Sequence, residues 1–198
     1  MAPRAYTLRR RATTAAATRL GIIEAAAEVY RERGVAGTTI GAVADRADVS
    51  RGTVVHHFGG ADGLLEAVLE HVLATIEIPD ERVLVGSTSP EDRIHRFVVA
   101  MVRFYERTTS WWEVFRRDLE LPALHAREMT FWASFERLRG AALGAVASDR
   151  TVAATVGTLV HPGTLGTFRE AGLGLDETID VIADLIVDLV HRRQEGPA

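Results

Sequence analysis

The chain has 198 residues, of which 47% are hydrophobic, and this is enough for one or two small domains with a sizeable core. It contains no cysteine, which excludes disulfides, cysteine-based zinc sites and thiol catalysis. The net charge of −4 is uneven: residues 1–60 carry nine arginines against five acidic residues, and residues 61–198 carry 14 against 22. A basic first part on an acidic body indicates that the first part meets a polyanion.

The first 17 residues are rich in arginine, threonine and alanine and show little apolar periodicity, so we expect a flexible basic arm at 1–17. Thr13, Thr14 and Arg19 interrupt what would be the apolar part of a signal peptide, so we expect no export signal. No run of 18 apolar residues occurs, so the sequence predicts no membrane-spanning helix. We therefore expect a cytoplasmic protein.

A helical pattern begins at Thr18 and ends at Gly34, which suits the left-handed backbone that follows many helices. Two short helices are predicted next, at 39–46 and 50–57. The threonine pair opens the first helix, and a serine caps the second. Asp48 tolerates the left-handed backbone of the tight turn between them. The capping residues are Thr38, Thr39 and Ser50.

Two short helices joined by a tight turn favour a helix-turn-helix, whose second helix enters the major groove of DNA. Arg51 can bond guanine through two hydrogen bonds, and Thr53 offers a hydroxyl to phosphate or a methyl to thymine. Gly52 lets the backbone come close to the duplex, and a helix N-terminus attracts phosphate.

His56 and His57 have three readings: a metal site, contacts to phosphate, or packing. Adjacent helix residues point about 100° apart, and no cysteine or glutamate cluster completes a metal site nearby. We therefore expect no metal, and His57 remains a candidate for either a phosphate contact or packing.

The rest of the chain also reads as helical. Asp62 is expected to cap a long connecting helix, and the polar stretch 79–90 separates it from later helices. Those helices are predicted at 91–108, 110–120, from Pro122, at 150–171 with Asp149 as cap, and at 177–193 with Asp176 as cap. Pro162 should kink or break the fourth of them.

Period-two alternation is not sustained anywhere, so the sequence predicts an all-α fold of roughly nine helices. It consists of an N-terminal three-helix DNA-binding domain at 18–62 and a C-terminal connecting helix and ligand-binding and dimerisation domain at 63–198.

Aromatic side chains are concentrated in the second domain, where two adjacent pairs occur. Because adjacent helix residues cannot both face one interior, one member of each pair should line a cavity or an interface. An apolar cavity with a few polar groups is the usual small-molecule site, although core packing explains most aromatic residues. The candidate pocket residues are Phe104, Trp111, Trp112, Phe115, Asp118, His125, Glu128, Phe131, Trp132 and His161.

The last helix is apolar on most of its faces, so it must be buried on two sides. Small residues on the preceding helix permit close approach, and we expect the two helices to form a two-fold symmetric four-helix dimer interface. The candidate interface residues are Ala153, Gly157, Ile179, Ile182, Ile186 and Leu189.

The segment TTIGAVADRADVSRGTVVHHFGGADGLL, residues 38–65, resembles the DNA-binding segment of the tetracycline-repressor (TetR) family of bacterial regulators. The resemblance implies an all-helical homodimer that binds a palindromic operator and releases it when a small molecule binds. It implies that Thr39 contacts the DNA backbone and that His57 approaches a phosphate. It also places Arg51, Gly52 and Thr53 against bases or adjacent phosphates, with Ser50 and His56 beside them.

Three positions depart from the family pattern: Gly41, Val55 and Ala61 stand where arginine or another polar residue, tyrosine and lysine are usual. Each lost phosphate contact weakens binding and its salt dependence. Arginines of the arm are expected to compensate by reaching the minor groove or the backbone. These arginines are Arg4, Arg9, Arg10 and Arg11.

The leading hypothesis is a ligand-responsive repressor that binds double-stranded DNA. An activator or partner-controlled regulator of the same family is the first alternative, and a helical small-molecule-binding protein or enzyme is the second. The sequence shows no nucleophile paired with a base, no metal-ligand spacing and no phosphate loop, so we expect neither enzymatic activity nor a cofactor.

Overall fold

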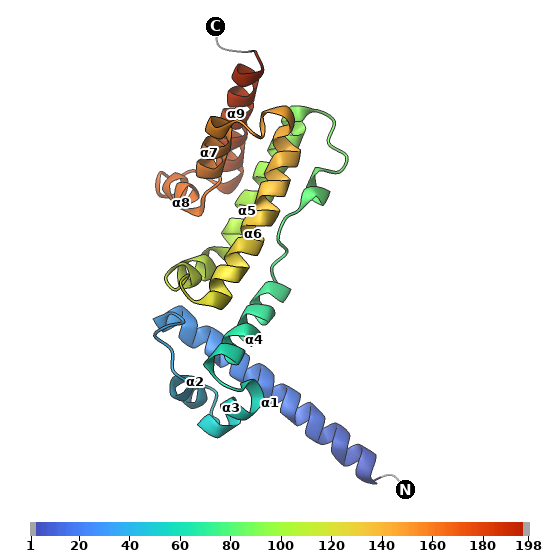
Figure 1. Cartoon of the computed structure of the whole chain (residues 1–198), viewed down its shortest axis with the longest axis vertical. Coiled ribbons are helices and arrows are strands. Elements are labelled where there is room, and N and C mark those ends of the chain that lie inside the picture. Colours follow the sequence, from blue (N-terminus) through green and yellow to red (C-terminus); the bar gives the residue numbers. More distant parts are fainter. Residues whose placement is uncertain (1–2, 196–198) are drawn as a thin grey trace. The chain divides into compact units, whose positions relative to one another are not determined.

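The computed structural model describes the backbone of residues 3–195 and the side chains of residues 13–195. This part of the chain contains helices and no strand, which confirms the all-α prediction (Figure 1). The helices are α1 (Pro3–Arg33), α2 (Ile40–Arg46), α3 (Arg51–Phe58), α4 (Ala61–Ala74), α5 (Pro90–Arg116), α6 (Pro122–Leu143), α7 (Arg150–Leu159), α8 (Pro162–Glu170) and α9 (Leu175–Gln194), with short 3₁₀ turns at Glu81–Leu84 and Gly144–Val146.

The chain forms two compact units. The head unit consists of Met1–Thr75 and Ser110–Arg127, and the body unit consists of Ile76–Thr109 and Glu128–Ala198. The last turns of α5 and the first turn of α6 therefore belong to the head, although the sequence assigned all of 63–198 to the second domain. Buried polar contacts of this segment, described below, explain the difference.

The core of the head is built by one apolar face from each of α1 to α4. Ile22 and Val29 of α1 pack with Val43 of α2, Val54 of α3 and Leu64 of α4, and all five are almost completely buried. The predicted flexible arm is wrong for the backbone of residues 3–17, because α1 begins at Pro3. Alanine and arginine, the commonest residues of this stretch, are strong helix formers and need no apolar face to extend a helix that is already nucleated. The side chains of Arg4, Arg9, Arg10 and Arg11 lie outside the described residues.

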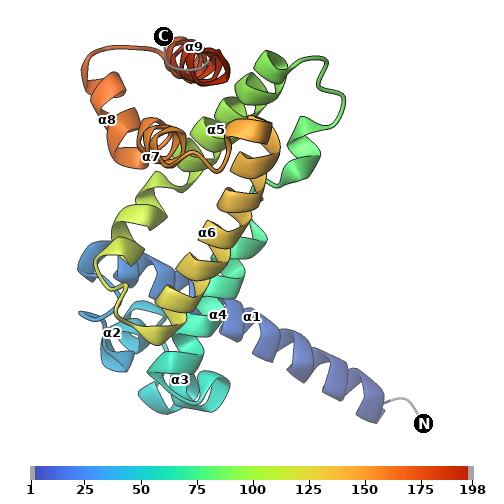
Figure 2. The same cartoon turned by 45° about the horizontal axis from the view of Figure 1, so that its top comes forward.

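The body is a helical bundle in which α5 and α6 run side by side in both views (Figure 2). Phe97 and Met101 of α5, Leu138 of α6, Val156 of α7 and Ile182 of α9 have no exposed surface and form the centre of its core.

Helix α5 is continuous where the sequence predicted two helices, at 91–108 and 110–120. The hydroxyls of Thr108 and Thr109 donate to the carbonyls of Phe104 and Tyr105 one turn earlier, at 2.9 and 2.7 Å. Threonine can bond back to its own helix in this way, so a pair of threonines does not end a helix.

The break at Pro162 is confirmed, because α7 ends at Leu159 and α8 begins at Pro162. The Thr158 carbonyl, which a proline cannot serve, accepts from the His161 N–H at 3.2 Å and from the Thr164 hydroxyl at 2.6 Å. The chain thereby turns between α7 and α8 without leaving this carbonyl unpaired.

Three of the predicted caps of the later helices can be compared with the structure. The carboxylate of Asp149 accepts from the N–H groups of Thr151 and Val152, as predicted. Asp62 and Asp176 are not caps, because glycines occupy the cap positions of α4 and α9. Both carboxylates lie instead in the first helical turn, where they interact favourably with the helix dipole.

Candidate nucleic-acid interface

The turn between α2 and α3 is held by side-chain caps at the start of both helices. The Thr39 hydroxyl accepts from the Ala42 N–H at 3.2 Å. The Ser50 hydroxyl oxygen accepts from the Thr53 N–H at 3.0 Å and lies 2.8 Å from the Thr53 hydroxyl, with which it shares a hydrogen bond. Asp48 adopts a left-handed backbone with φ of 52°, as the tight turn requires. These bonds fix the direction in which α3 leaves the turn.

Helix α3 is anchored by one face and free on the other. Val54 and Phe58 are buried in the head, and the Arg19 guanidinium lies 5.0 Å from the centre of the Phe58 ring. The remaining positions of α3 are exposed or half-buried: Arg51, Gly52, Thr53, Val55, His56 and His57. The residues that the sequence singled out for DNA contact therefore share the free side of the helix.

Arg51 lies across the first turn of α2, in space that Gly41 leaves open. A Cβ atom at Gly41 would stand 2.8 Å from Arg51 Nη2 and 2.9 Å from Nε, which is too close for any real side chain. The departure from the family pattern at Gly41 thus has a local reason, because a longer residue there would displace the guanidinium. The sequence carried no signal for this contact, since it joins two helices.

His56 and His57 lie against each other at the end of α3. Their rings meet edge to face with centroids 5.7 Å apart. Among the residues whose side chains are described, no group of three or more histidine, cysteine, aspartate or glutamate residues could hold a metal ion.

The segment 110–127 braces the end of α1 through a buried carboxylate. Asp118, only 8% exposed, accepts from the backbone N–H of Val35 at 2.7 Å and from that of Ala36 at 3.2 Å. These two N–H groups lie just beyond the end of α1, so no helical hydrogen bond is available to them and they need another acceptor. The Asp118 carboxylate, which the sequence offered as a polar group of a ligand pocket, is thus engaged by two backbone donors of the head.

Trp111 and Phe115 also belong to the head. Their rings stack with centroids 5.1 Å apart, and the Arg31 guanidinium lies over the Trp111 ring at 4.0 Å. Arg127 and Glu66 add an ion pair at 3.4 Å. Trp111 thus holds α5 against α1, and it also lines an open hollow of about 320 Å³ in the head beside Arg31 and His71.

The other predicted pocket residues have packing, capping or surface positions. Phe104 and Phe131 stack at 5.2 Å in the body, and Trp132 donates from Nε1 to Glu128 at 3.4 Å. His161 caps α8, with Nδ1 accepting from the Gly163 N–H at 3.0 Å. Of the two that remain, Trp112 is half-buried and His125 is exposed.

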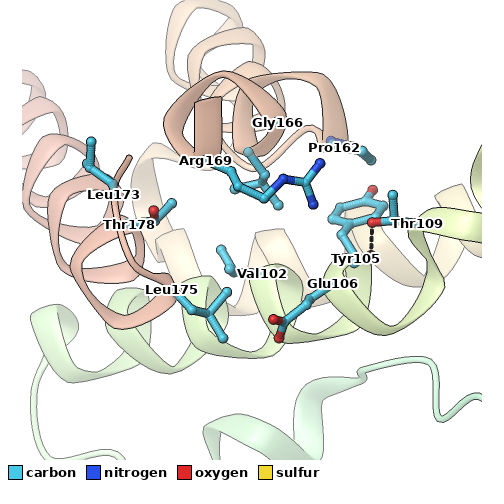
Figure 3. A pocket seen from close by; sticks show the side chains of 11 residues that line it. Val102, Tyr105, Glu106, Thr109, Pro162, Gly166, Arg169, Leu173, Leu175 and Thr178 are labelled. Atoms are coloured by element: carbon cyan, nitrogen blue, oxygen red, sulfur yellow. Dashed lines mark hydrogen bonds between the residues drawn. The ribbon is translucent and has the colours of Figure 1, made fainter. Parts of the chain in front are cut away.

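A hollow of about 130 Å³ lies elsewhere in the body, between α5, α8 and the start of α9 (Figure 3). None of the residues predicted for a pocket lines it. Four positions of α5 at helical spacing form one wall, and the break at Pro162 sets α8 as the opposite wall. The lining residues are Val102, Tyr105, Glu106, Thr109, Pro162, Leu165, Gly166, Arg169, Leu173, Leu175 and Thr178.

The predicted dimer residues divide into two groups. Ile179, Ile182 and Ile186 are buried within the protomer core, so they cannot contact a partner without unfolding. Because α9 is apolar on most of its faces, the sequence pattern could not distinguish the face that packs in the protomer core from the face that is open to solvent. The half-buried residues are Ala153, Gly157 and Leu189.

The part of the chain that the structure describes has no helix long and apolar enough to cross a membrane.

Comparison with known proteins agrees with this geometry. The family described as "Bacterial regulatory proteins, tetR family" matches residues 22–68, which lie within the head. The transcriptional regulator BetI of Burkholderia ambifaria strain MC40-6 is 39% identical over 83 residues, and that of Burkholderia mallei strain NCTC 10229 is 40% identical over 83 residues. Each match covers 41% of this chain and 43% of the relative, so the chain aligns with less than half the length of these regulators.

Solved structures share the fold over most of the chain. A TetR-like transcriptional regulator from Rhodococcus sp. RHA1 has a TM-score of 0.62 and 17% identity over 91% of this chain and 97% of its own. The protein of a SmeT–triclosan complex has a TM-score of 0.58 and 22% identity over 87% and 91%. Residues 22–68 therefore match the tetR family of bacterial regulatory proteins, and the chain shares its fold with TetR-like regulators.

Proposed function

We propose that the chain is a repressor that binds a palindromic operator as a homodimer and releases it when a small molecule binds. The observation that carries the proposal is the free side of α3, held by the Ser50 cap at its start and by buried Val54 and Phe58 along its length. A helix fixed in this way can present its N-terminal residues to the major groove without paying to order them. A regulator of this kind acts on chromosomal DNA, and we propose the cytoplasm as its compartment.

Each exposed residue of α3 has a role that follows from its chemistry. Among the residues whose side chains are described, none forms a hydrogen bond or ion pair with the Arg51 guanidinium, which can therefore leave Gly41 and bond a guanine edge. The Thr53 hydroxyl is occupied by Ser50, which leaves its methyl group for thymine. His56 and half-buried His57 lie at the end of α3, where they can approach phosphates. Thr39 stands at the start of α2, where its hydroxyl accepts from the Ala42 N–H and can donate its own proton to a phosphate.

Dimerisation is proposed through exposed apolar side chains of α9 and small residues of α7. Leu185 is 45% exposed, and half-buried Val181 and Leu189 lie four residues before and after it on the same face. Ala153 and Gly157 lie one turn apart on α7, and their small side chains allow another helix to approach closely. Helix α7 packs on α9 within the protomer. Two copies of this pair can form a four-helix interface with two-fold symmetry.

The dimer is tested with Leu185→Asp, which places a charge on the exposed face without entering the core. We expect sedimentation to show a monomer with unchanged helical circular dichroism and weaker operator binding. Glu195→Asp, at the exposed end of α9, is the control. A Leu185→Asp protein that remains dimeric would overturn the proposed interface.

DNA recognition is tested by selecting duplexes from a random pool with the purified chain. We expect an inverted repeat, with each half-site read by one α3. Deleting the gene in its host should then raise transcription from promoters that carry this repeat. Selection of no common sequence would contradict the proposal, and lower transcription after deletion would make the regulator an activator.

A further inference from the structure

The hollow of the body unit carries two opposite charges from different helices. Arg169 extends from α8 and Glu106 from α5, and both line the hollow (Figure 3). Within the described residues, neither side chain forms an ion pair or hydrogen bond, with the other or with a third group. Both side chains are exposed to solvent. A ligand can therefore bind them without the full cost of burying a charge.

Hydroxyl groups of the hollow present acceptors. The Thr109 hydroxyl donates to the Tyr105 carbonyl at 2.7 Å, and the Thr178 hydroxyl donates to the Gly174 carbonyl at 2.8 Å. Because each hydroxyl has only one proton, its oxygen can only accept a further bond. Together with the Glu106 carboxylate, these oxygens suit a ligand group that is rich in N–H donors.

The remaining surface of the hollow is mostly aliphatic, with the Tyr105 ring beside it, and its volume is small. Val102, Leu165, Leu173 and Leu175 line it with hydrocarbon. A volume of about 130 Å³ is well below the 300–1,000 Å³ or so that is usual for drug-sized ligands. The hollow therefore excludes a large aromatic effector and admits a molecule the size of an amino acid.

From these observations we propose that the hollow binds a small aliphatic zwitterion, such as an amino acid. Its carboxylate bonds the Arg169 guanidinium, and its ammonium bonds Glu106 with help from the Thr109 and Thr178 oxygens. This rests on the proposed function only in taking the ligand as the molecule that releases DNA.

The binding test uses isothermal titration calorimetry of the whole chain, without DNA. L-leucine, L-valine and δ-aminovalerate are the zwitterions. Isocaproate and isoamylamine share the leucine skeleton and carry one charge each. We expect at least one zwitterion to bind. If leucine binds, its two single-charge analogues should bind at least about tenfold more weakly than leucine does. Failure of all three zwitterions to bind, or equal binding of the analogues, overturns the proposal.

Variants identify the groups that carry the recognition. Arg169→Gln and Glu106→Gln should each weaken zwitterion binding about tenfold or more, because each removes one charge-assisted contact. Glu170→Gln and Arg107→Gln remove neighbouring exposed charges that do not line the hollow, and they should bind as the unaltered chain does. Loss of equal size in all four variants would mean that Arg169 and Glu106 are not specific contacts, and it would overturn the proposed site.

A third variant tests occupancy of the hollow without changing charge. A Cβ atom at Gly166 would meet no other atom within 4 Å, so Gly166→Leu is tolerated by the protomer and fills the hollow. We expect zwitterion binding to be lost with no fall in the melting temperature. Gly140→Ala, also on a helix with open space around it, is the control.

Release of DNA is measured separately, by adding the bound zwitterion to the complex with the selected duplex. Release supports its role as effector. Binding in calorimetry with no release would leave the site intact and remove its proposed regulatory role. A chain that binds the zwitterion but selects no duplex would instead mean that the proposed function has failed.

Discussion

The head and the body place their functional side chains by different means. In the head, α3 is positioned by caps and turns whose partners lie within a few residues. The side chains of α3 that are proposed to contact DNA lie on its exposed side. In the body, the hollow is walled by three helices that are up to 76 positions apart in the chain, from Val102 to Thr178. Substitutions on the free side of α3 should therefore change binding alone, whereas substitutions in the body change binding or folding according to which face they touch.

The largest effect is expected from Ile186→Asp in the body. Ile186 has no exposed surface, and an unpaired carboxylate there costs several kcal/mol, on the order of 4 or more. Thermal denaturation followed by circular dichroism should show loss of the cooperative transition. Its neighbour Leu185 is the matched control, because Leu185→Asp lies on the exposed face and should keep the transition. Equal stability of the two variants would mean that α9 does not pack as described.

Asp118→Ala should have the next largest effect and should act in the head. The substitution leaves the N–H groups of Val35 and Ala36 without their acceptor in a buried place, at a cost of about 1–3 kcal/mol. Hydrogen exchange should speed up at these two amides. Asp118→Asn keeps an acceptor oxygen and should lose less. Unchanged exchange in the alanine variant would show that the carboxylate does not brace α1.

Ser50→Ala should cost about 1 kcal/mol, because it removes the cap of α3. Operator affinity should fall along with head stability, since the cap sets the direction of the recognition helix. Ser50→Asp, which can still cap the helix, separates the two readouts: stability should be kept, while a negative charge facing phosphate weakens DNA binding. Loss of stability in Ser50→Asp would contradict the capping role.

The smallest effect concerns the pH dependence of body stability. Hydrogen bonds from the Ser89 hydroxyl, the Glu91 backbone and His191 lower the pKa of Glu91 from 4.5 to about 2. Because the folded pKa is depressed, this stabilisation is present above pH 4.5 and is lost as the pH falls toward 2. Glu91→Gln should flatten the fall in melting temperature across that window. Glu91 is exposed, so the change should be small, and an equally steep fall in the variant would contradict the assignment.

Prediction from sequence succeeded where the determinants are local. Thr39, Ser50, Asp48 and Asp149 were correctly placed, because a cap or a tight turn depends on residues two to four positions away. The break at Pro162 follows from the missing N–H of one residue. The residues matched by the tetR family lie in the same local region, which is why resemblance and geometry agree there.

Prediction failed where the determinants are distant contacts. Neither the packing of Arg51 on Gly41 nor the bonds from Asp118 to the loop after α1 can be seen from spacing, because the partners lie on different elements. Apolar residues cover most faces of α9, so Ile186 and Leu185 look alike in sequence and differ completely in exposure. Aromatic residues attracted the pocket prediction, yet the hollow of the body is lined mainly by aliphatic side chains and two opposite charges, with Tyr105 as its one aromatic residue.

The N-terminal residues of α3 are proposed to read base edges. The most direct measurement is fluorescence anisotropy of the selected duplex and of a scrambled duplex with the unaltered chain, Arg51→Ala and the control Arg33→Ala. We predict that Arg51→Ala loses about 1–3 kcal/mol on the selected duplex and much less on the scrambled one, while Arg33→Ala weakens both alike. Equal losses on the two duplexes with Arg51→Ala, or no preference of the unaltered chain for the selected sequence, would contradict the claim.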